Sequence, residues 1–228
     1  MKDTKKIFFV IPAYNEGKSI IKVIRGLQRA GYREIVVIDD GSSDNTYSEA
    51  AKCGVHVLRH IINRGQGASL KTGIDFALKN SADVIVTFDS DGQHRVEDLG
   101  VMLKPVLNGE VDVTLGSRFL TNAKIPLGRR ILLKGSVVVQ WLFYGVKLSD
   151  AHNGFRVLSR KAANEIRIDS DRMEHASEIV EEIAKRKLRY KEVPVVIRYT
   201  DYSLKKGHGS FGQALKVLFK MFVRKLTT

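Results

Sequence analysis

The sequence has one cysteine, no low-complexity tract, no long Gly/Ser/Pro-rich linker and no long hydrophobic run. Because Cys53 has no second cysteine to pair with, an internal disulfide is excluded, and the chain suits a reducing compartment. A membrane-spanning helix needs about 20 mostly apolar residues, and no stretch of the sequence provides them. The first apolar run meets Pro12, Asn15 and Glu16 without a small-residue cleavage site, which favours a strand over a signal peptide. These absences predict one compact unit that is not integral to a membrane.

The net charge of +13 is unevenly distributed along the chain. Residues 1–120 carry 16 Lys/Arg against 15 Asp/Glu, whereas residues 121–228 carry 22 against 10. A neutral first half followed by a basic second half implies that the second half faces something anionic. Nucleic acid and the phosphates of a membrane surface are the two candidates.

Apolar, β-branched runs alternate with helix-like segments in the first half. The predicted strands lie at 6–14, 34–40, 55–60, 83–91 and 111–119. Helical spacing or helix-capping residues fill the stretches between them. This alternation predicts an α/β fold, in which a mostly parallel sheet is covered by helices on both faces.

The second half is less regular. Helices are predicted at 127–148, 174–187 and 210–226, a turn and short strand at 150–160, and a further strand at 190–200. Pro194 indicates that the last strand lies at a sheet edge. The helices at 127–148 and 210–226 are predicted to be basic and amphipathic. The residues that indicate this are Arg129, Arg130, Lys134, Trp141, Phe143 and Tyr144 in the first helix, and Lys216, Lys220 and Arg224 in the last. Both patterns suit helices in a membrane interface, although the last helix could instead dock on the core with a solvated basic edge.

Polar residues follow four of the predicted strands, and in such sheets ligands bind at the carboxyl ends of the strands. One shared rim should therefore carry Pro12, Tyr14, Asn15, Glu16, Asp39, Asp40, Gly41, Ser42, Asp44, Asp89, Asp91, Gln93, Ser117 and Arg118. Asp89 and Asp91 stand two residues apart, so they point to one side of a strand or splay around a turn. Carboxylates at this spacing suit Mg²⁺ or Mn²⁺, which can neutralise the charge of a departing nucleotide diphosphate.

Several motifs together carry a more specific resemblance. "VIPAYNEG", "VVIDDGSSDNT" and "VTFDSDGQH" resemble, in order and spacing, the family 2 glycosyltransferases of the GT-A fold. The dolichol-phosphate mannosyltransferase and polyprenyl-phosphate glucosyltransferase group is the most similar. "NRGQGASLKTGIDFA", "GSRF", "DAHNGFRVLSR" and "RYTDYSLKKGHGS" extend the likeness through nearly the whole chain. The resemblance implies a single GT-A (Rossmann-like) domain over 1–228, with a nucleotide-sugar-binding half at 1–120 and an acceptor- and membrane-facing half at 121–228.

The same resemblance implies roles for individual residues. The nucleotide base and ribose would be bordered or held by Pro12, Tyr14, Glu16, Asp39 and Asp40. The metal and the donor diphosphate would be bound by Asp89, Asp91 and Gln93, with Ser90 among the donor-binding residues. Arg118 would approach a phosphate of donor or acceptor, and Asp150 would be a base or an acceptor-orienting group. A loop that closes over donor phosphates would contribute Lys206, with Arg198 and Lys205 nearby.

Some of these polar residues have simpler explanations. Asp44 suits a helix cap better than a ligand, and Asp40 could serve only the backbone amides of its turn. His94 is a candidate metal ligand, but polar packing or a phosphate contact is more common at such a position. His175 and Glu178 share a helix face, where they would contact the acceptor or form a capped, solvated helix start.

The activity implied by the resemblance is inverting, metal-dependent transfer of a hexose from a GDP-mannose or UDP-glucose type donor to a polyprenyl or dolichyl phosphate. A lipid phosphate is already ionised and needs little general base, and the basic second half favours it. The alternative acceptor is a sugar hydroxyl in polysaccharide or glycolipid synthesis, which would need Asp150 as base. Many members of the group carry C-terminal membrane spans, whereas this sequence does not. Amphipathic segments or a small membrane-protein partner would then hold the protein peripherally on the cytoplasmic face of an anionic membrane.

Three other classes of protein fit the sequence less well. A haloacid-dehalogenase-type phosphatase also uses a strand ending in D-x-D-G, but usually as its first strand and followed by Thr or Val rather than Gln93. A nucleic-acid-binding module would suit the isoelectric point of 9.8, but no recognised motif is present and an acidic rim would repel a polyanion. The intact carboxylates argue against a silent scaffold. We therefore expect an enzyme that does not bind nucleic acid.

Overall fold

The computed structural model describes residues 5–121, 127–150 and 153–198 of the 228. The first half follows the predicted alternation, with the order β1 (Ile7–Ala13), α1 (Ile20–Arg29), β2 (Ile35–Asp39), α2 (Thr46–Ala51), β3 (His56–Arg59), α3 (Gln66–Lys79), β4 (Val84–Thr87), a 3-10 turn (Val96–Asp98), α4 (Leu99–Leu107) and β5 (Val113–Ser117). A second 3-10 turn (Arg118–Leu120) leads to α5 (Leu127–Tyr144), β6 (Arg156–Ser159), α6 (Arg160–Glu165), α7 (His175–Lys185) and β7 (Tyr190–Pro194). The short helix α6 was not predicted, because it follows β6 directly without a separating loop.

The seven strands form one sheet in the order β3-β2-β1-β4-β6-β5-β7. Only β6 runs antiparallel to its neighbours, pairing with β4 on one side and β5 on the other. The remaining pairs are parallel, so the predicted mostly parallel sheet is confirmed. β7 is an edge strand, as Pro194 indicated. The insertion of β6 between β4 and β5 places the start of the second half inside the sheet formed by the first.

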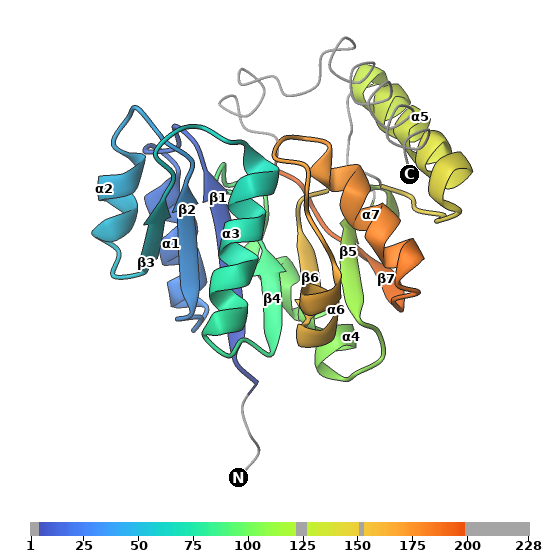
Figure 1. Cartoon of the computed structure of the whole chain (residues 1–228), viewed down its shortest axis with the longest axis horizontal. Coiled ribbons are helices and arrows are strands. Elements are labelled where there is room, and N and C mark those ends of the chain that lie inside the picture. Colours follow the sequence, from blue (N-terminus) through green and yellow to red (C-terminus); the bar gives the residue numbers. More distant parts are fainter. Residues whose placement is uncertain (1–4, 122–126, 151–152, 199–228) are drawn as a thin grey trace.

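Helices cover both faces of the sheet, as predicted (Figure 1). Apolar side chains of α1 and α4 pack with alternate residues of the central strands on one face, where Phe9 and Phe88 are fully buried. The other face is covered by α3, α6 and α7. α3 approaches the sheet closely at Gly73, where a Cβ would lie 2.3 Å from Val10 Cγ1, so only glycine fits. These two apolar layers hold the strand ends in a fixed arrangement.

α5 is shorter than the predicted helix over 127–148 and contacts α7. It ends at Gly145, which has a positive φ of 70° and whose N–H bonds to Trp141 O. Exposed apolar side chains on α5 include Val138, Trp141 and Leu142. Within the described ranges, no helix has both the length and the apolar character needed to cross a membrane. The predicted helix over 210–226 lies outside the described residues.

Candidate active site

The carboxyl ends of β1, β2, β4 and β5 lie at one edge of the sheet because these four strands run in the same direction. Hydrogen bonds tie the segments after these strands together. Ser90 Oγ donates to Pro12 O at 2.8 Å, and Asn15 N donates to Ser42 Oγ at 2.9 Å. The predicted rim is therefore present in the structure. Ser90 joins the ends of two strands, and this buried contact occupies its hydroxyl hydrogen.

Asp89 stands two residues beyond β4, with 27% of its side chain exposed. Its Oδ2 lies 2.9 Å from His94 Nε2, and its Oδ1 accepts a 3.1 Å hydrogen bond from Gln66 Nε2. Burial raises the pKa of Asp89, but its contact with His94 and the charge of Arg156 outweigh burial and hold this pKa below its ordinary value. Asp89 is therefore a carboxylate, fixed in orientation from two sides.

Asp91 is held by its own turn. Gln93 N donates to Asp91 Oδ1 at 2.9 Å, and Gln93 Nε2 donates to Asp91 Oδ2 at 2.7 Å. Burial raises the pKa of Asp91, and repulsion from the carboxylates of Asp89 and Glu16 raises it further. Three acidic groups thus share one small region, where a cation would relieve their mutual repulsion.

The donor set of this region fits a hard divalent cation. Asp89, Asp91 and the amide oxygen of Gln93 are oxygen ligands of the kind that Mg²⁺ and Mn²⁺ prefer. Among the described residues, no group of three or more His, Cys, Asp or Glu side chains could hold a metal by itself. A cation here would therefore complete its coordination with oxygens of a bound diphosphate and with water.

Three residues that surround Asp89 were not predicted from the sequence. Gln66 begins α3 and donates to the carboxylate. A Cβ at Gly154 would lie 2.6 Å from Asp89 Oδ2 and 2.8 Å from Oδ1, so the absence of a side chain makes room for the carboxylate. Arg156 is buried, which lowers its pKa to about 10, while Asp89 and Asp150 act in the opposite direction. These residues lie in the motifs "NRGQG" and "NGFR", which carry the family resemblance. Only the antiparallel placement of β6, however, brings Gly154 and Arg156 next to Asp89.

The surroundings of His94 are those of a packed side chain rather than of a separate metal ligand. Its ring lies 5.3 Å from the ring of Phe88 and 5.1 Å from that of Phe155, and its Nε2 faces Asp89. Its buried Nδ1 has no hydrogen-bond partner among the described residues. The polar-packing explanation of His94 is therefore the one that the structure supports.

The two aspartates after β2 differ in role. Asp39 is fully buried and accepts a hydrogen bond from Ser42 N, while its Oδ2 lies 3.1 Å from Arg59 Nε without the alignment of a hydrogen bond. That buried Oδ2 has no hydrogen-bond partner in the described part of the chain, so it could accept a hydrogen bond from an N–H or O–H group of a ligand. Asp40 instead accepts hydrogen bonds from Arg64 N and Gly65 N at 3.0 and 2.7 Å. Asp40 therefore holds loop 60–65, in line with the simpler explanation that it serves backbone amides, and its part in holding the nucleotide stays a prediction.

Asp150 and Arg118 form a buried ion pair. Asp150 Oδ2 accepts hydrogen bonds from Arg118 Nε at 2.6 Å and from Arg118 N at 3.1 Å. Both side chains are almost completely buried. The Asp150 side chain has no exposed surface that an acceptor hydroxyl could reach. The geometry thus favours an orienting role for Asp150 over the role of general base.

The other predicted residues have varied surroundings. Tyr14 is 45% exposed at the rim, where a flat ligand could stack on it. Glu16 is buried, and its Oε2 accepts a hydrogen bond from Ser19 Oγ at 2.6 Å. Asp44 accepts hydrogen bonds from Thr46 N, the first residue of α2, and from Gly17 N, so it binds backbone amides beside the helix start, while Asn45 occupies the N-cap position. Lys206 and the segment 199–210 lie outside the described residues.

The predicted solvated start of the helix at His175 and Glu178 is wrong. Both side chains are buried, and Glu178 Oε2 accepts hydrogen bonds from Asp169 N and Ser170 N at 3.1 and 2.9 Å. Glu178 therefore anchors the loop before α7. The helical spacing showed that these residues share a face, but it did not show which way that face points.

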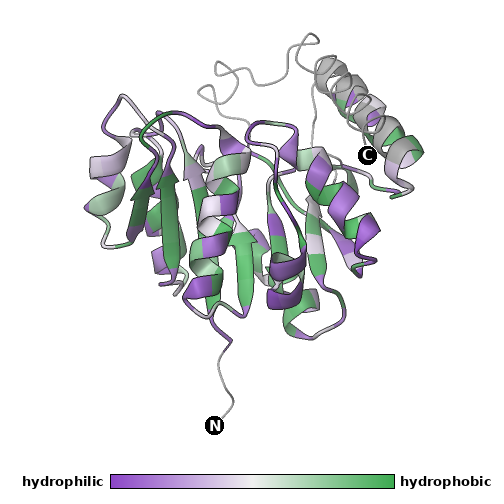
Figure 2. Cartoon of the chain, viewed as in Figure 1, coloured by the Kyte–Doolittle hydropathy of each residue, from purple (hydrophilic) through white to green (hydrophobic). Residues whose placement is uncertain are grey.

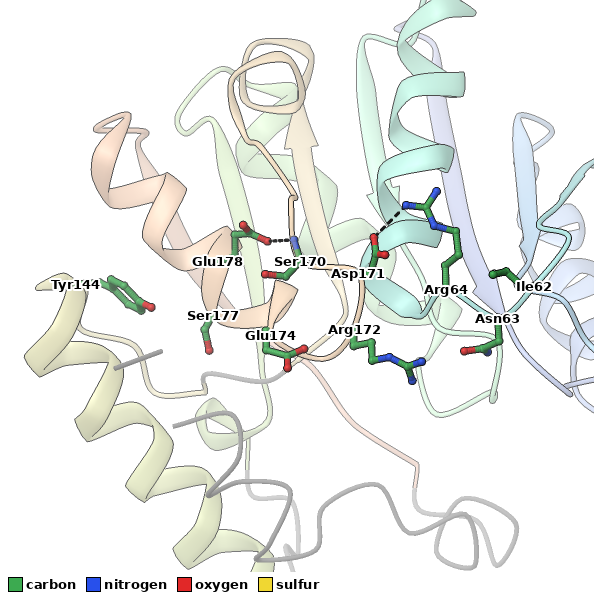
Figure 3. A pocket seen from close by; sticks show the side chains of 10 residues that line it. All are labelled: Ile62, Asn63, Arg64, Tyr144, Ser170, Asp171, Arg172, Glu174, Ser177 and Glu178. Carbon is green, nitrogen blue, oxygen red and sulfur yellow. Dashed lines mark hydrogen bonds and ion pairs between the residues drawn. The ribbon is translucent and has the colours of Figure 1, made fainter. Parts of the chain in front are cut away.

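A pocket of about 480 Å³ is lined in part by the loop that leads into α3. It lies between the loop before α3, the loop before α7 and the end of α5 (Figure 3), and its lining includes Ile62, Arg64, Tyr144, Arg172 and Glu174. Arg64 Nη2 lies 3.2 Å from Asp171 Oδ1, which joins the two loops across the pocket. Gln66, which contacts Asp89, follows the pocket-lining Arg64 by two residues, so the start of α3 connects the pocket with Asp89.

Comparisons with known proteins agree with this geometry. The family model described as Glycosyl transferase family 2 matches residues 8–167. An uncharacterized protein of Methanocaldococcus jannaschii is 41% identical over 226 residues, covering 97% of this chain and 93% of its own length. UDP-N-acetylglucosamine--dolichyl-phosphate N-acetylglucosaminyltransferase of Methanococcus voltae is 33% identical and covers 97% of this chain and 95% of itself.

A likeness also exists among solved structures. Glucosyl-3-phosphoglycerate synthase of Mycobacterium tuberculosis, crystallised with Mn²⁺ and UDP-glucose, superposes with a TM-score of 0.73 over 99% of this chain and 79% of that one. At 18% identity, this likeness concerns the fold alone. From the family model and the archaeal relatives, the chain belongs to glycosyl transferase family 2 and is a glycosyltransferase with the GT-A fold.

Proposed function

We propose that the protein transfers a hexosyl group from a nucleotide-diphosphate sugar to a polyprenyl or dolichyl phosphate, with inversion at the anomeric carbon. The observation that carries the acceptor is the 33% identity, over 97% of the chain, to the Methanococcus voltae enzyme whose name specifies a dolichyl-phosphate acceptor. For the donor we propose the GDP-mannose or UDP-glucose type, and the name of that relative adds UDP-N-acetylglucosamine to the candidates.

The donor would lie along the rim. Tyr14 and Pro12 would border the base, and the buried Oδ2 of Asp39 would accept a hydrogen bond from the base or ribose. Asp89 and Asp91, with Gln93, would hold Mg²⁺ or Mn²⁺, which when bound neutralises the charge that develops on the leaving diphosphate. Asp89 and Asp91 are oriented in advance by His94, Gln66 and Gln93, so little reorganisation is needed when the donor binds.

The buried carboxylate of Asp150 supports a phosphate acceptor over a hydroxyl acceptor. A sugar hydroxyl must lose a proton as it attacks, whereas a lipid phosphate is already ionised at neutral pH. Asp150 Oδ2 already accepts two hydrogen bonds from Arg118, and its side chain has no exposed surface that an incoming hydroxyl could reach. A phosphate oxygen needs only to be positioned, and positioning accounts for much of the rate in such reactions.

The two halves of the domain would divide the work. In this proposal, residues 1–120 bind the nucleotide sugar and residues 121–228 face the acceptor and the membrane. The excess of 22 Lys/Arg over 10 Asp/Glu in the second half supports a peripheral location on an anionic membrane, on its cytoplasmic face. A small membrane-protein partner would strengthen the attachment.

The test is a donor and acceptor screen with purified protein. GDP-mannose, UDP-glucose and UDP-N-acetylglucosamine are each combined with a polyprenyl phosphate, with and without Mg²⁺ or Mn²⁺. We expect transfer from one donor that EDTA abolishes and that Asp91→Asn reduces by more than about a hundredfold. The matched control is Asp75→Asn, which removes an exposed carboxylate on α3 that pairs with Lys71. Full activity of Asp91→Asn, or transfer to sugar hydroxyls alone, would refute the proposal.

A further inference from the structure

The loop between β3 and α3 exposes two adjacent isoleucines. Ile61 is 100% exposed and Ile62 is 68% exposed. In Figure 2 the connection from β3 to α3 crosses the upper edge of the molecule, with a green, hydrophobic stretch that turns purple before α3 begins. The transfer of two β-branched apolar side chains from water into an apolar phase is favourable, because it lowers the free energy. Such a pair at the mouth of a site needs an explanation other than packing.

The loop is held rigidly in this exposed position. The carboxylate of Asp40 accepts hydrogen bonds from Arg64 N and Gly65 N, and it also contacts His60 Nδ1 at 2.7 Å. A Cβ at Gly41 would lie only 2.8 Å from the backbone carbon of Ile62, so the two segments are in close contact. Ile61 and Ile62 therefore project from a loop whose backbone is held in place by Asp40 and Gly41.

Cationic side chains surround the two isoleucines. Arg64 follows them in the loop, with 52% of its side chain exposed. The neighbouring loop before α7 adds Arg172 and the 44% exposed Met173, and it lies against Gly65, where a Cβ would be 2.9 Å from Arg172 Cγ. Arg64 pairs with the half-exposed Asp171, so the two arginines share this surface with one carboxylate. An apolar tip flanked by arginines matches the boundary between acyl chains and phosphates in an anionic bilayer.

We propose that loop 60–65 is a membrane anchor, which inserts Ile61 and Ile62 into the acyl boundary of an anionic bilayer while Arg64 and Arg172 meet lipid phosphates. This rests on the proposed function only in that the bilayer would supply the acceptor. The pocket in Figure 3 is lined by Ile62 on one side and by Tyr144 of α5 on the other. Insertion of the loop would therefore place that pocket at the level of the headgroups, beside the exposed Trp141 and Leu142 of α5.

The experiment measures binding of the full chain to vesicles of phosphatidylcholine with phosphatidylglycerol by flotation. Ile61→Ser combined with Ile62→Ser leaves the net charge unchanged and should weaken binding by about tenfold or more. The matched control is Val101→Ser, since Val101 is 50% exposed on α4, which packs on the sheet face opposite to α3. In a Cys53→Ser background, an environment-sensitive fluorophore on Ile61→Cys should shift to the blue when vesicles are added.

The outcomes separate this inference from the proposed function. Wild-type affinity of the double variant, an equal loss in the control, or no shift of the fluorophore would overturn the anchor. If the wild type forms a dimer in solution that the double variant disperses, a second copy occupies the loop and the anchor is likewise overturned. Binding of the nucleotide sugars, measured calorimetrically without vesicles, reports on the proposed function alone. Vesicle binding that depends on the loop, without binding of a nucleotide sugar, would thus support the anchor and refute the proposed function.

Discussion

At the scale of single residues, the carboxylates of this chain divide into those that are exposed to a ligand and those that hold the protein together. Asp89 and Asp91 stand at the rim with oriented oxygens. Asp40 and Asp150, which have the same side chain, are used to hold a loop and an arginine. A sequence motif identifies such residues as a group, whereas their hydrogen-bond partners distinguish their roles.

The space beside Asp89 gives a prediction at this scale. In Gly154→Ala the new methyl group would overlap both carboxylate oxygens, at 2.6 and 2.8 Å, so Asp89 must move away from His94 and Gln66. We expect kcat/KM for glycosyl transfer to fall by about tenfold to a hundredfold, since displacements on the order of 1 Å have such effects. The melting temperature should change little, because the displaced side chain is partly exposed.

The control for this substitution is Gly100→Ala. A Cβ at Gly100 meets nothing within 4 Å, and the residue lies in α4. Alanine is favoured over glycine in a helix by up to about 1 kcal/mol, so this variant should be slightly more stable and fully active. Unchanged activity of Gly154→Ala would show that the position of Asp89 does not limit the reaction.

At the scale of elements, the edge of the sheet is held by one carboxylate at the start of β5. Asp112 accepts hydrogen bonds from Arg189 N, Nε and Nη2 at 3.0, 3.2 and 3.1 Å, just before β7 begins. Hydrogen bonds from Arg189 lower the pKa of Asp112, although burial acts in the opposite direction. These hydrogen bonds between Asp112 and Arg189, called the clamp below, fix the register in which the edge strand β7 joins the sheet.

The clamp predicts a pH-dependent stability. Asp112→Asn should lower the free energy of unfolding by about 1 to 3 kcal/mol at neutral pH, because charge-assisted hydrogen bonds are lost. Since the folded pKa of Asp112 lies below the ordinary value of 3.8, its contribution is complete above that value and is lost as the pH falls through the folded pKa. Urea unfolding of both proteins at pH 7 and near pH 3 should show the difference shrinking in acid.

Glu110→Gln is the control for the clamp, because Glu110 is an exposed neighbour whose contact is with Asn108. It should change stability by less than about 0.5 kcal/mol at either pH. A difference between Asp112→Asn and wild type that grows in acid would contradict the assigned direction of the pKa shift.

At the scale of the whole molecule, β6 joins the two halves of the chain. It lies between β4 and β5 and pairs with both, so the second half contributes a central strand to the sheet of the first. α5 in turn contacts α7, which packs on the same sheet. These connections support the proposal of one domain over the chain rather than two separate ones.

One domain should unfold in one transition. Far-UV circular dichroism reports mainly on the helices and the sheet, and the only tryptophan, Trp141, reports on α5 in the second half. We expect both signals to change with the same midpoint in urea, because neither half can keep the central sheet alone. Two midpoints that differ by more than the experimental error would indicate separate domains.

The charge distribution predicts a salt-sensitive association of the whole molecule with anionic membranes. With a net charge of +13, the protein should float with vesicles containing phosphatidylglycerol at low salt and be released at high salt. Vesicles of phosphatidylcholine alone are the control and should bind far less. Flotation that never occurs at low salt, or that persists unchanged in high salt, would argue against electrostatic attraction.

The sequence alone determined the alternation of β1 to β5 with their helices, the shared rim at the strand ends and the pair Asp89 and Asp91. These follow from periodicity and from residue types that are local along the chain. The family assignment depended on the order of several motifs, and the matched relatives confirm it.

Only the tertiary structure decided where β6 lies and what it brings with it. The runs of apolar residues show that a strand exists but not which strands it pairs with, because pairing depends on side chains distant in sequence. The antiparallel position of β6 sets Gly154 and Arg156 beside Asp89. Burial likewise turned Glu178 inward and left Ile61 in water, since the direction of a helix face or a loop tip is fixed by what packs against it.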